Sequence, residues 1–103
     1  MKRTKNMVYR PTTESRELEL YVVNCGKMYE TIIVPTIENL KKKVAKGIFD
    51  KEKAVDSFYR VATVGSDNYY KDFGHKFSVT ERFTVATDLV EYYEDMIFED
   101  YWI

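Results

Sequence analysis

The segment that begins at Ser78 constrains the fold of this chain more than any other part of its sequence. Ser78 and Glu81 have the spacing of a capping box, in which each side chain accepts a hydrogen bond from the backbone amide of the other residue. Beyond this start signal, apolar residues fall on one stripe of a helix: Val79, Phe83, Ala86, Val90, Tyr93 and Ile97. We therefore predict a helix that begins within two residues of Ser78 and buries this stripe.

A second amphipathic helix is predicted between Asp50 and Gly74. Aspartate is a frequent helix N-cap and glycine a frequent helix stop, while Gly65 provides an internal break point. The predicted apolar face comprises Ala54, Val55, Phe58, Val61, Ala62, Tyr69 and Phe73. We expect this helix and the one that follows Ser78 to pack together through four side chains: Phe58, Ala62, Phe83 and Val90.

The first half of the chain allows two arrangements. Alternation in residues 17–24 (ELELYVVN) predicts a β-strand. The spacing of Tyr29, Ile33 and Ile37 favours one kinked helix over about residues 28–46, whereas Pro35, which removes a helix-interior hydrogen bond, favours a strand at 29–34 and a helix starting at the proline. The predicted fold class is mainly α: a compact bundle of about three helices, with a short N-terminal β-strand or hairpin as an optional addition.

Composition predicts a soluble protein with one domain. The 103 residues are 45% hydrophobic and 32% charged, which supplies enough apolar material for one core. Residues 1–16 are basic and lack apolar periodicity, so we expect a flexible basic arm (1–16) followed by a single globular domain (17–103). The single Cys25 excludes an intramolecular disulfide and suits a cytoplasmic location. No apolar run approaches the ~20 residues of a membrane span.

The reactive side chains argue against catalysis. The single histidine, His75, and the single cysteine, Cys25, have none of the spacings of a zinc site or a cysteine–histidine pair. Four glycines provide no glycine-rich phosphate loop. We therefore expect no enzymatic activity, no metal site and no cofactor.

Charge is distributed unevenly along the chain. Residues 1–60 hold 13 Lys and Arg against 8 Asp and Glu, whereas residues 61–103 hold 3 against 9. In the last predicted helix, four carboxylates lie opposite the apolar stripe: Asp88, Glu91, Asp95 and Glu99. Aromatic side chains beside carboxylates favour protein binding, because they give large contact area at small entropic cost. The predicted partner-binding residues are Asp88, Glu91, Tyr92, Glu94, Asp95, Phe98, Glu99, Asp100 and Trp102.

A lysine cluster supports an alternative hypothesis. Lys41, Lys42, Lys43 and Lys46 close a predicted helix and, together with the basic arm, could contact the phosphates of a nucleic acid. Lysines in a last helical turn also complement the helix dipole, and the acidic last helix could neutralise them. On this hypothesis the protein is a small nucleic-acid-binding regulator.

Four segments carry a resemblance to known sequences: Glu17-Leu18-Glu19-Leu20-Tyr21-x-x-Asn24, Ile37-x-Asn39-Leu40-x-Lys42-Lys43-x-Ala45-Lys46-Gly47, Asp50-x-x-Lys53-Ala54-Val55 and Phe77-Ser78-x-x-x-Arg82. With these segments the chain resembles a family of small uncharacterised proteins carried by phages and plasmids of Gram-positive bacteria. The likeness spans about residues 17–90 and is most specific at residues 39–55. The family brings no established catalytic residues, and both the basic arm and the tail ending Tyr101-Trp102-Ile103 depart from it.

The resemblance implies an accessory role for a mobile genetic element, and small charge-polarised proteins of such elements often disarm host defence. An acidic surface can imitate a phosphate backbone and occupy a basic groove meant for nucleic acid. The leading hypothesis is a phage protein that inhibits a bacterial nucleic-acid-targeting defence system by stoichiometric binding, with a CRISPR nuclease complex as the first candidate. The expected partner is a host defence protein or ribonucleoprotein with a basic groove, in the cytoplasm of the host cell.

Overall fold

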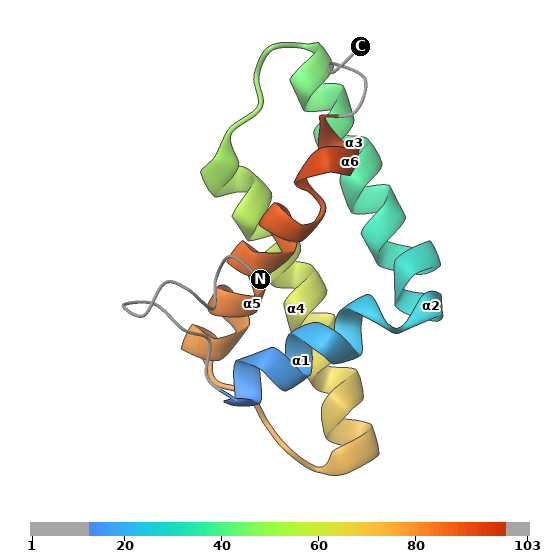
Figure 1. The fold of residues 1–103 in the computed structure, drawn as a ribbon, viewed down its shortest axis with the longest axis vertical. Coiled ribbons are helices and arrows are strands. Elements are labelled where there is room, and N and C mark those ends of the chain that lie inside the picture. Colours follow the sequence, from blue (N-terminus) through green and yellow to red (C-terminus); the bar gives the residue numbers. More distant parts are fainter. Residues whose placement is uncertain (1–12, 99–103) are drawn as a thin grey trace.

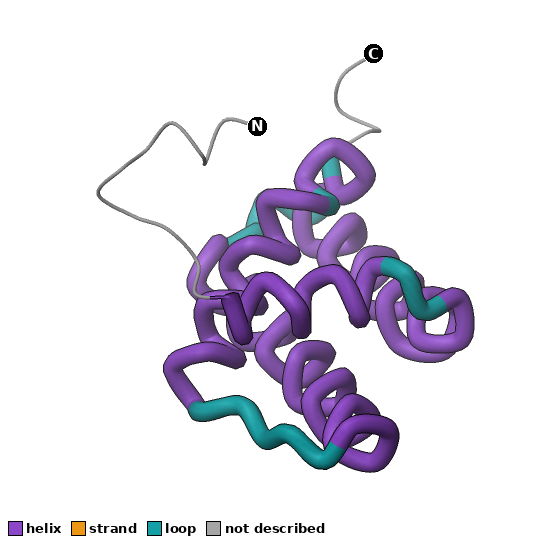
Figure 2. Tube along the Cα trace, turned by 60° about the horizontal axis from the view of Figure 1, so that its bottom comes forward, coloured by secondary structure: helices purple, strands orange, loops and turns teal. Residues whose placement is uncertain are grey.

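The structure, a computed structural model, describes residues 13–98, and these residues form helices with no strand among them. The elements in chain order are α1 (Thr13–Val23), α2 (Gly26–Met28), a π-helical turn η2 (Tyr29–Ile33), α3 (Val34–Ala45), α4 (Lys51–Phe73), α5 (Val79–Tyr92) and α6 (Glu94–Ile97). Helix α1 crosses α4 and contacts α5, while α6 lies against α3 (Figure 1). Figure 2 shows the helices joined by short loops. The predicted mainly helical fold class is therefore confirmed.

The predicted N-terminal strand is wrong, because residues 17–23 belong to helix α1. The alternating segment also contains an i, i+4 apolar pair, Leu18 and Val22, and both side chains are fully buried against the rest of the core. Leu20, which strand geometry would place beside them, is 48% exposed. Residues 1–12 of the predicted basic arm lie outside the described residues, and α1 begins at Thr13.

The kinked-helix alternative describes residues 26–45 correctly, because α2, η2 and α3 follow one another without interruption. Pro35 lies in the first turn of α3, directly after the π-helical turn. In that turn the Val34 amide donates to the carbonyl of Tyr29, five residues earlier. The wider turn accommodates the proline, which has no amide to donate and whose ring would crowd a regular α-helix.

Helix α4 has the predicted boundaries. The Asp50 carboxylate accepts from the Glu52 amide at 2.9 Å, and Gly74 ends the helix with a positive φ of 73°. Gly65 does not break the helix. It lies where α1 crosses, because a side chain at this position would meet Val22 and Leu18 of α1. The predicted apolar face is buried as far as Ala62, but Phe73 at the end of the helix is 65% exposed.

Helix α5 confirms the predicted start, and four residues of the predicted apolar stripe are buried, Ala86, Val90, Tyr93 and Ile97, but the first two are not. The Ser78 hydroxyl accepts from the Glu81 amide at 3.0 Å, and the Glu81 carboxylate accepts from the Ser78 amide at 2.8 Å. Val79 and Phe83 were predicted to be core residues but are 61% and 52% exposed. The two helices that pack on α5, α1 and α4, cover a broader and rotated face, on which these side chains are buried: Val85, Ala86, Asp88, Leu89 and Val90.

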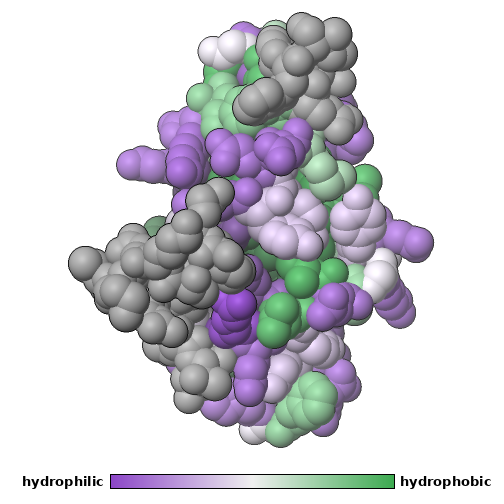
Figure 3. Space-filling model, in the orientation of Figure 1, coloured by the Kyte–Doolittle hydropathy of each residue, from purple (hydrophilic) through white to green (hydrophobic). Residues whose placement is uncertain are grey.

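One apolar cluster joins all the helices, and Phe58 is the largest fully buried side chain in it. Its ring stacks on Tyr93, with ring centroids 5.9 Å apart and an interplanar angle of 12°. At the surface, Figure 3 shows hydrophobic and intermediate side chains gathered in the middle of the face that carries α1, with hydrophilic ones mostly along its edges. Helix α1 is also tied to α4 by two tyrosine hydrogen bonds, from Tyr21 to Asp72 (2.9 Å) and from Tyr69 to Glu17 (3.1 Å).

Candidate partner-binding surface

The predicted acidic helix is interrupted at Tyr93, between α5 and α6. Tyr93 has φ −100° and ψ 10°, outside the helical range, and its ring points into the core, where it stacks on Phe58. The Ile97 amide donates to the Tyr93 carbonyl at 3.0 Å, so helical hydrogen bonding resumes at once in α6. Carboxylates that a continuous helix would align on one face are therefore divided between two helices.

Four of the predicted residues lie exposed around this break: Glu91, Tyr92, Glu94 and Asp95. Tyr92 is 59% exposed, and its ring meets Tyr93 edge to face at 4.9 Å, so a buried residue holds this exposed ring in place. Phe98 is half-buried against Phe49, with ring centroids 4.9 Å apart. It is therefore partly a core residue. We define the acidic aromatic surface by Glu91, Tyr92, Glu94 and Asp95.

Asp88 does not belong to this surface, although the sequence placed it there. Its side chain is 2% exposed, so its carboxylate is not at the surface. The sequence predicted the packing of α5 on α4, whereas α1 packs on α5 as well. Three further predicted residues lie outside the described residues: Glu99, Asp100 and Trp102.

Burial beneath this surface raises the pKa of Tyr93 to about 12, from an ordinary value of 10.0. Desolvation of the hydroxyl is the main cause, and the neighbouring Tyr92 and Tyr29 add to it. The folded state thus holds the Tyr93 proton more tightly than the unfolded chain does. Burial, and then hydrogen bonding to a carboxylate, also raises the pKa values of Tyr21 and Tyr69.

We expect the fold to lose stability as the pH rises from about 10 to about 12, partly through Tyr93. The contribution is fully present below the pKa of the unfolded chain and is lost as the pH passes through the folded pKa. Urea denaturation at stepped alkaline pH measures this loss. The Tyr93→Phe variant keeps Tyr21 and Tyr69 and should show a shallower loss. An equally steep decline in both proteins would contradict the assignment to Tyr93.

The predicted lysine cluster lies at the end of α3. Lys42 and Lys43 are in its last turn and Lys46 is its C-cap residue, where cations complement the partial negative charge of the helix end. Lys42 and Lys46 are exposed, whereas Lys41 and Lys43 are half-buried. Helix α6 packs against α3, so the acidic and basic surfaces occupy neighbouring helices.

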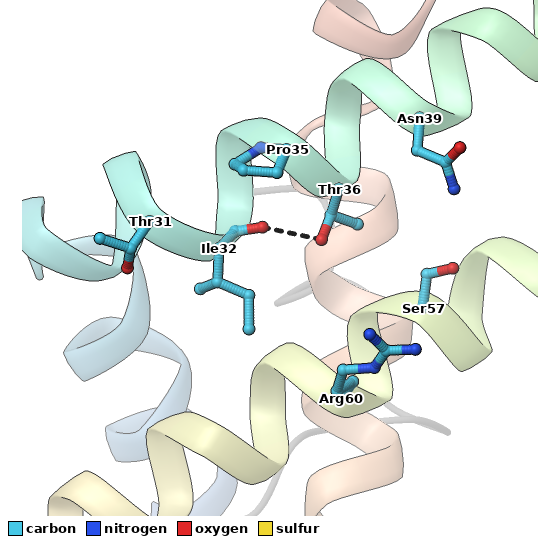
Figure 4. A pocket seen from close by; sticks show the side chains of 7 residues that line it. All are labelled: Thr31, Ile32, Pro35, Thr36, Asn39, Ser57 and Arg60. Atoms are coloured by element: carbon cyan, nitrogen blue, oxygen red, sulfur yellow. Dashed lines mark hydrogen bonds between the residues drawn. The ribbon is translucent and has the colours of Figure 1, made fainter.

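A depression of about 320 Å³ lies between α4 on one side and η2 with the first part of α3 on the other (Figure 4). Arg60 is the one charged residue in its lining. The hydroxyls of Thr31, Thr36 and Ser57 each donate to a carbonyl of their own helix, at 2.7, 2.7 and 3.2 Å. With its hydroxyl donors occupied and a single cation, this depression offers little for binding a ligand.

The sequence interpretation missed a second charged cluster. The three basic residues of the acidic half, Lys71, Lys76 and Arg82, line one depression between α4 and the start of α5. The available signal was that all three lie within twelve residues that span the predicted Gly74 stop. Counting net charge over a long segment concealed it.

Comparisons of this chain with protein-family models, with curated proteins and with solved structures found no match. Within residues 13–98, no helix combines the length and the apolar composition needed to cross a bilayer. No group of three or more His, Cys, Asp or Glu side chains in that part of the chain is placed to hold a metal ion.

Proposed function

We propose that this protein is an inhibitor from a mobile genetic element that binds a basic groove on a bacterial nucleic-acid-targeting defence protein. A CRISPR nuclease complex in the host cytoplasm is the first candidate partner. The observation that carries the proposal is the acidic aromatic surface at the α5–α6 break, where three exposed carboxylates lie within three residues of the exposed Tyr92 along the chain.

Glu91 is the strongest single indication of a binding role. It lies in the last turn of α5, which contains no basic residue, and a carboxylate is disfavoured there by the partial negative charge of the helix end. A departure from such a local rule is expected at functional positions. Glu94 and Asp95, by contrast, lie in the first turn of α6, where carboxylates stabilise a helix.

The chemistry of this surface suits a basic groove. Exposed carboxylates attract a cationic partner over long range and accelerate its association. The Tyr92 ring, backed by the buried Tyr93, supplies rigid contact area once the partner has docked. Carboxylates near one another in space can occupy the positions of successive phosphates, which explains how such a surface would displace nucleic acid.

The test is inhibition of a reconstituted CRISPR nuclease–guide RNA complex that cleaves its target DNA. We expect the parent protein to inhibit with a one-to-one endpoint. The triple variant E91Q/E94Q/D95N should bind the complex at least about tenfold more weakly, because three charge-assisted contacts are lost. The matched variant K42Q/K43Q/K46Q also changes three charges and should inhibit like the parent.

Three outcomes would overturn parts of this proposal. If the parent does not inhibit at large excess, the CRISPR nuclease is not the target. If the acidic variant inhibits as well as the parent, the surface is not used. If the lysine variant alone loses binding, and the affinity of the parent for nucleic acid falls steeply with salt, the nucleic-acid-binding hypothesis is correct. Thermal denaturation of both variants checks that the fold is intact.

A further inference from the structure

The acidic half of the chain contains a site of opposite charge. Residues 61–103 hold three basic side chains, and all three line a single depression of about 470 Å³. Lys71 comes from α4, Lys76 from the loop and Arg82 from α5, while Asp67 is the one acidic residue in the lining. Every Lys and Arg of a segment in which carboxylates outnumber them therefore lies around one depression.

Local signals bring these cations together. Gly74 adopts φ 73° and turns the chain at the end of α4, and the capping box at Ser78 starts α5 four residues later. This short connection places the last turn of α4 beside the first turns of α5. Phe77 belongs to this connection, and its buried side chain packs in the core and so anchors the loop.

Arg82 is held in position by neutral groups. Its Nε donates to the Ser78 carbonyl at 3.3 Å and its Nη1 to the Thr63 hydroxyl at 3.4 Å. Its guanidinium also lies over the Tyr59 ring, 5.5 Å from the centroid. Both of these hydrogen-bond acceptors are uncharged, and the adjacent Glu81 carboxylate accepts from the Ser78 amide. A guanidinium has five N–H donors, so three remain for a ligand.

Lys76 is positioned in a similar way. Its ammonium group lies over the ring of Tyr70, 5.2 Å from the centroid. A cation–π contact directs the side chain without neutralising it. Two of the three cations are therefore preorganised and keep their charge, as electrostatic recognition of an anion requires.

The charge of the site selects the class of ligand. Three cations and one carboxylate leave an excess of two positive charges. A phosphate monoester carries about −1.5 to −2 at pH 7, whereas a carboxylate carries only one negative charge. A phosphate also has three terminal oxygens that can accept from the fork of Arg82 and from two ammonium groups at once.

We propose that the depression formed by Lys71, Lys76 and Arg82 binds a phosphate group, either as inorganic phosphate or as the phosphate monoester of a nucleotide. The site is separate from the acidic aromatic surface, which lies at the other end of α5. This inference therefore stands independently of the inhibitor proposal.

The test is a titration of isotope-labelled protein followed by amide chemical shifts, with inorganic phosphate in one arm and a 5′-mononucleotide in the other. Sodium chloride at matched ionic strength is the reference. We expect saturable shifts confined to residues around 66–82. Tighter binding of the mononucleotide identifies a nucleotide site, whereas equal affinities identify free phosphate as the ligand.

The variant R82Q should weaken phosphate binding at least roughly tenfold, because it removes the positioned donors. The double variant K71Q/K76Q changes only exposed side chains and should weaken it similarly, which protects the test if R82Q disturbs α5. The matched control is R60Q. It removes an exposed arginine of α4 that lines the depression between α3 and α4 (Figure 4). Shifts that do not saturate, or an equal loss in R60Q, would overturn the proposal.

Discussion

Replacing Phe58 by alanine is expected to lower the free energy of unfolding by about 3–5 kcal/mol. The side chain is fully buried, it is the largest such side chain in the core, and it stacks on Tyr93. Alanine would lose both the transfer free energy of the ring and the packing around the cavity that remains. Because a small domain is stable by only about 5–15 kcal/mol, much of its stability would be lost. Urea denaturation measures the change.

The matched control is Phe83→Ala, which deletes the same ring from a position that is 52% exposed. We expect a loss below about 1 kcal/mol there. This pair also tests the rotation of α5, because the apolar stripe alone predicts that both rings are core residues. Equal losses in the two variants would show that the described packing of α5 is wrong.

Gly65→Ala is expected to destabilise the protein, against the usual preference of helices for alanine. A Cβ atom at this position would lie 2.5 Å from Val22 Cγ2, with Leu18 and Met28 at 3.6 and 3.7 Å. Val22 is fully buried, and as a β-branched residue in a helix it is largely restricted to one χ1 rotamer, so it cannot move aside easily. Overpacking costs about 1–3 kcal/mol and outweighs the gain in helix propensity of about 1 kcal/mol. Thermal or urea denaturation measures the net loss.

Two further variants separate these effects. Gly26→Ala adds a methyl group where nothing lies within 4 Å, so it should be neutral or stabilising by up to about 1 kcal/mol. In the background of Val22→Ala the clash is removed, and the added cost of Gly65→Ala should shrink or change sign. A stabilising Gly65→Ala in the parent protein would mean that α1 does not cross α4 at this glycine.

The sequence predicted the exposure of a site residue correctly only where the residue lies opposite the apolar face of its own helix. Glu91, Tyr92, Glu94 and Asp95 are exposed as predicted, because the opposite face of α5 and α6 carries the apolar residues. Asp88 was misplaced, because the apolar pattern of one helix does not show which of its polar residues other parts of the chain cover, and Asp88 is 2% exposed. The cluster of Lys71, Lys76 and Arg82 escaped prediction because a turn joins residues whose spacing suits no single helix face.

The sequence by itself determined both ends of α4 and the start of α5. Asp50, Gly74 and the pair Ser78–Glu81 act through hydrogen bonds and dihedral angles that involve residues at most four positions away. Every atom that takes part in such a signal lies within a short segment, so the signal does not depend on how the rest of the chain packs. Tertiary structure decided two other matters: that residues 17–23 are helical, and which face of α5 is buried. Both depend on how much apolar surface a distant element can cover, and here the close approach of α1 to Gly65 sets that geometry.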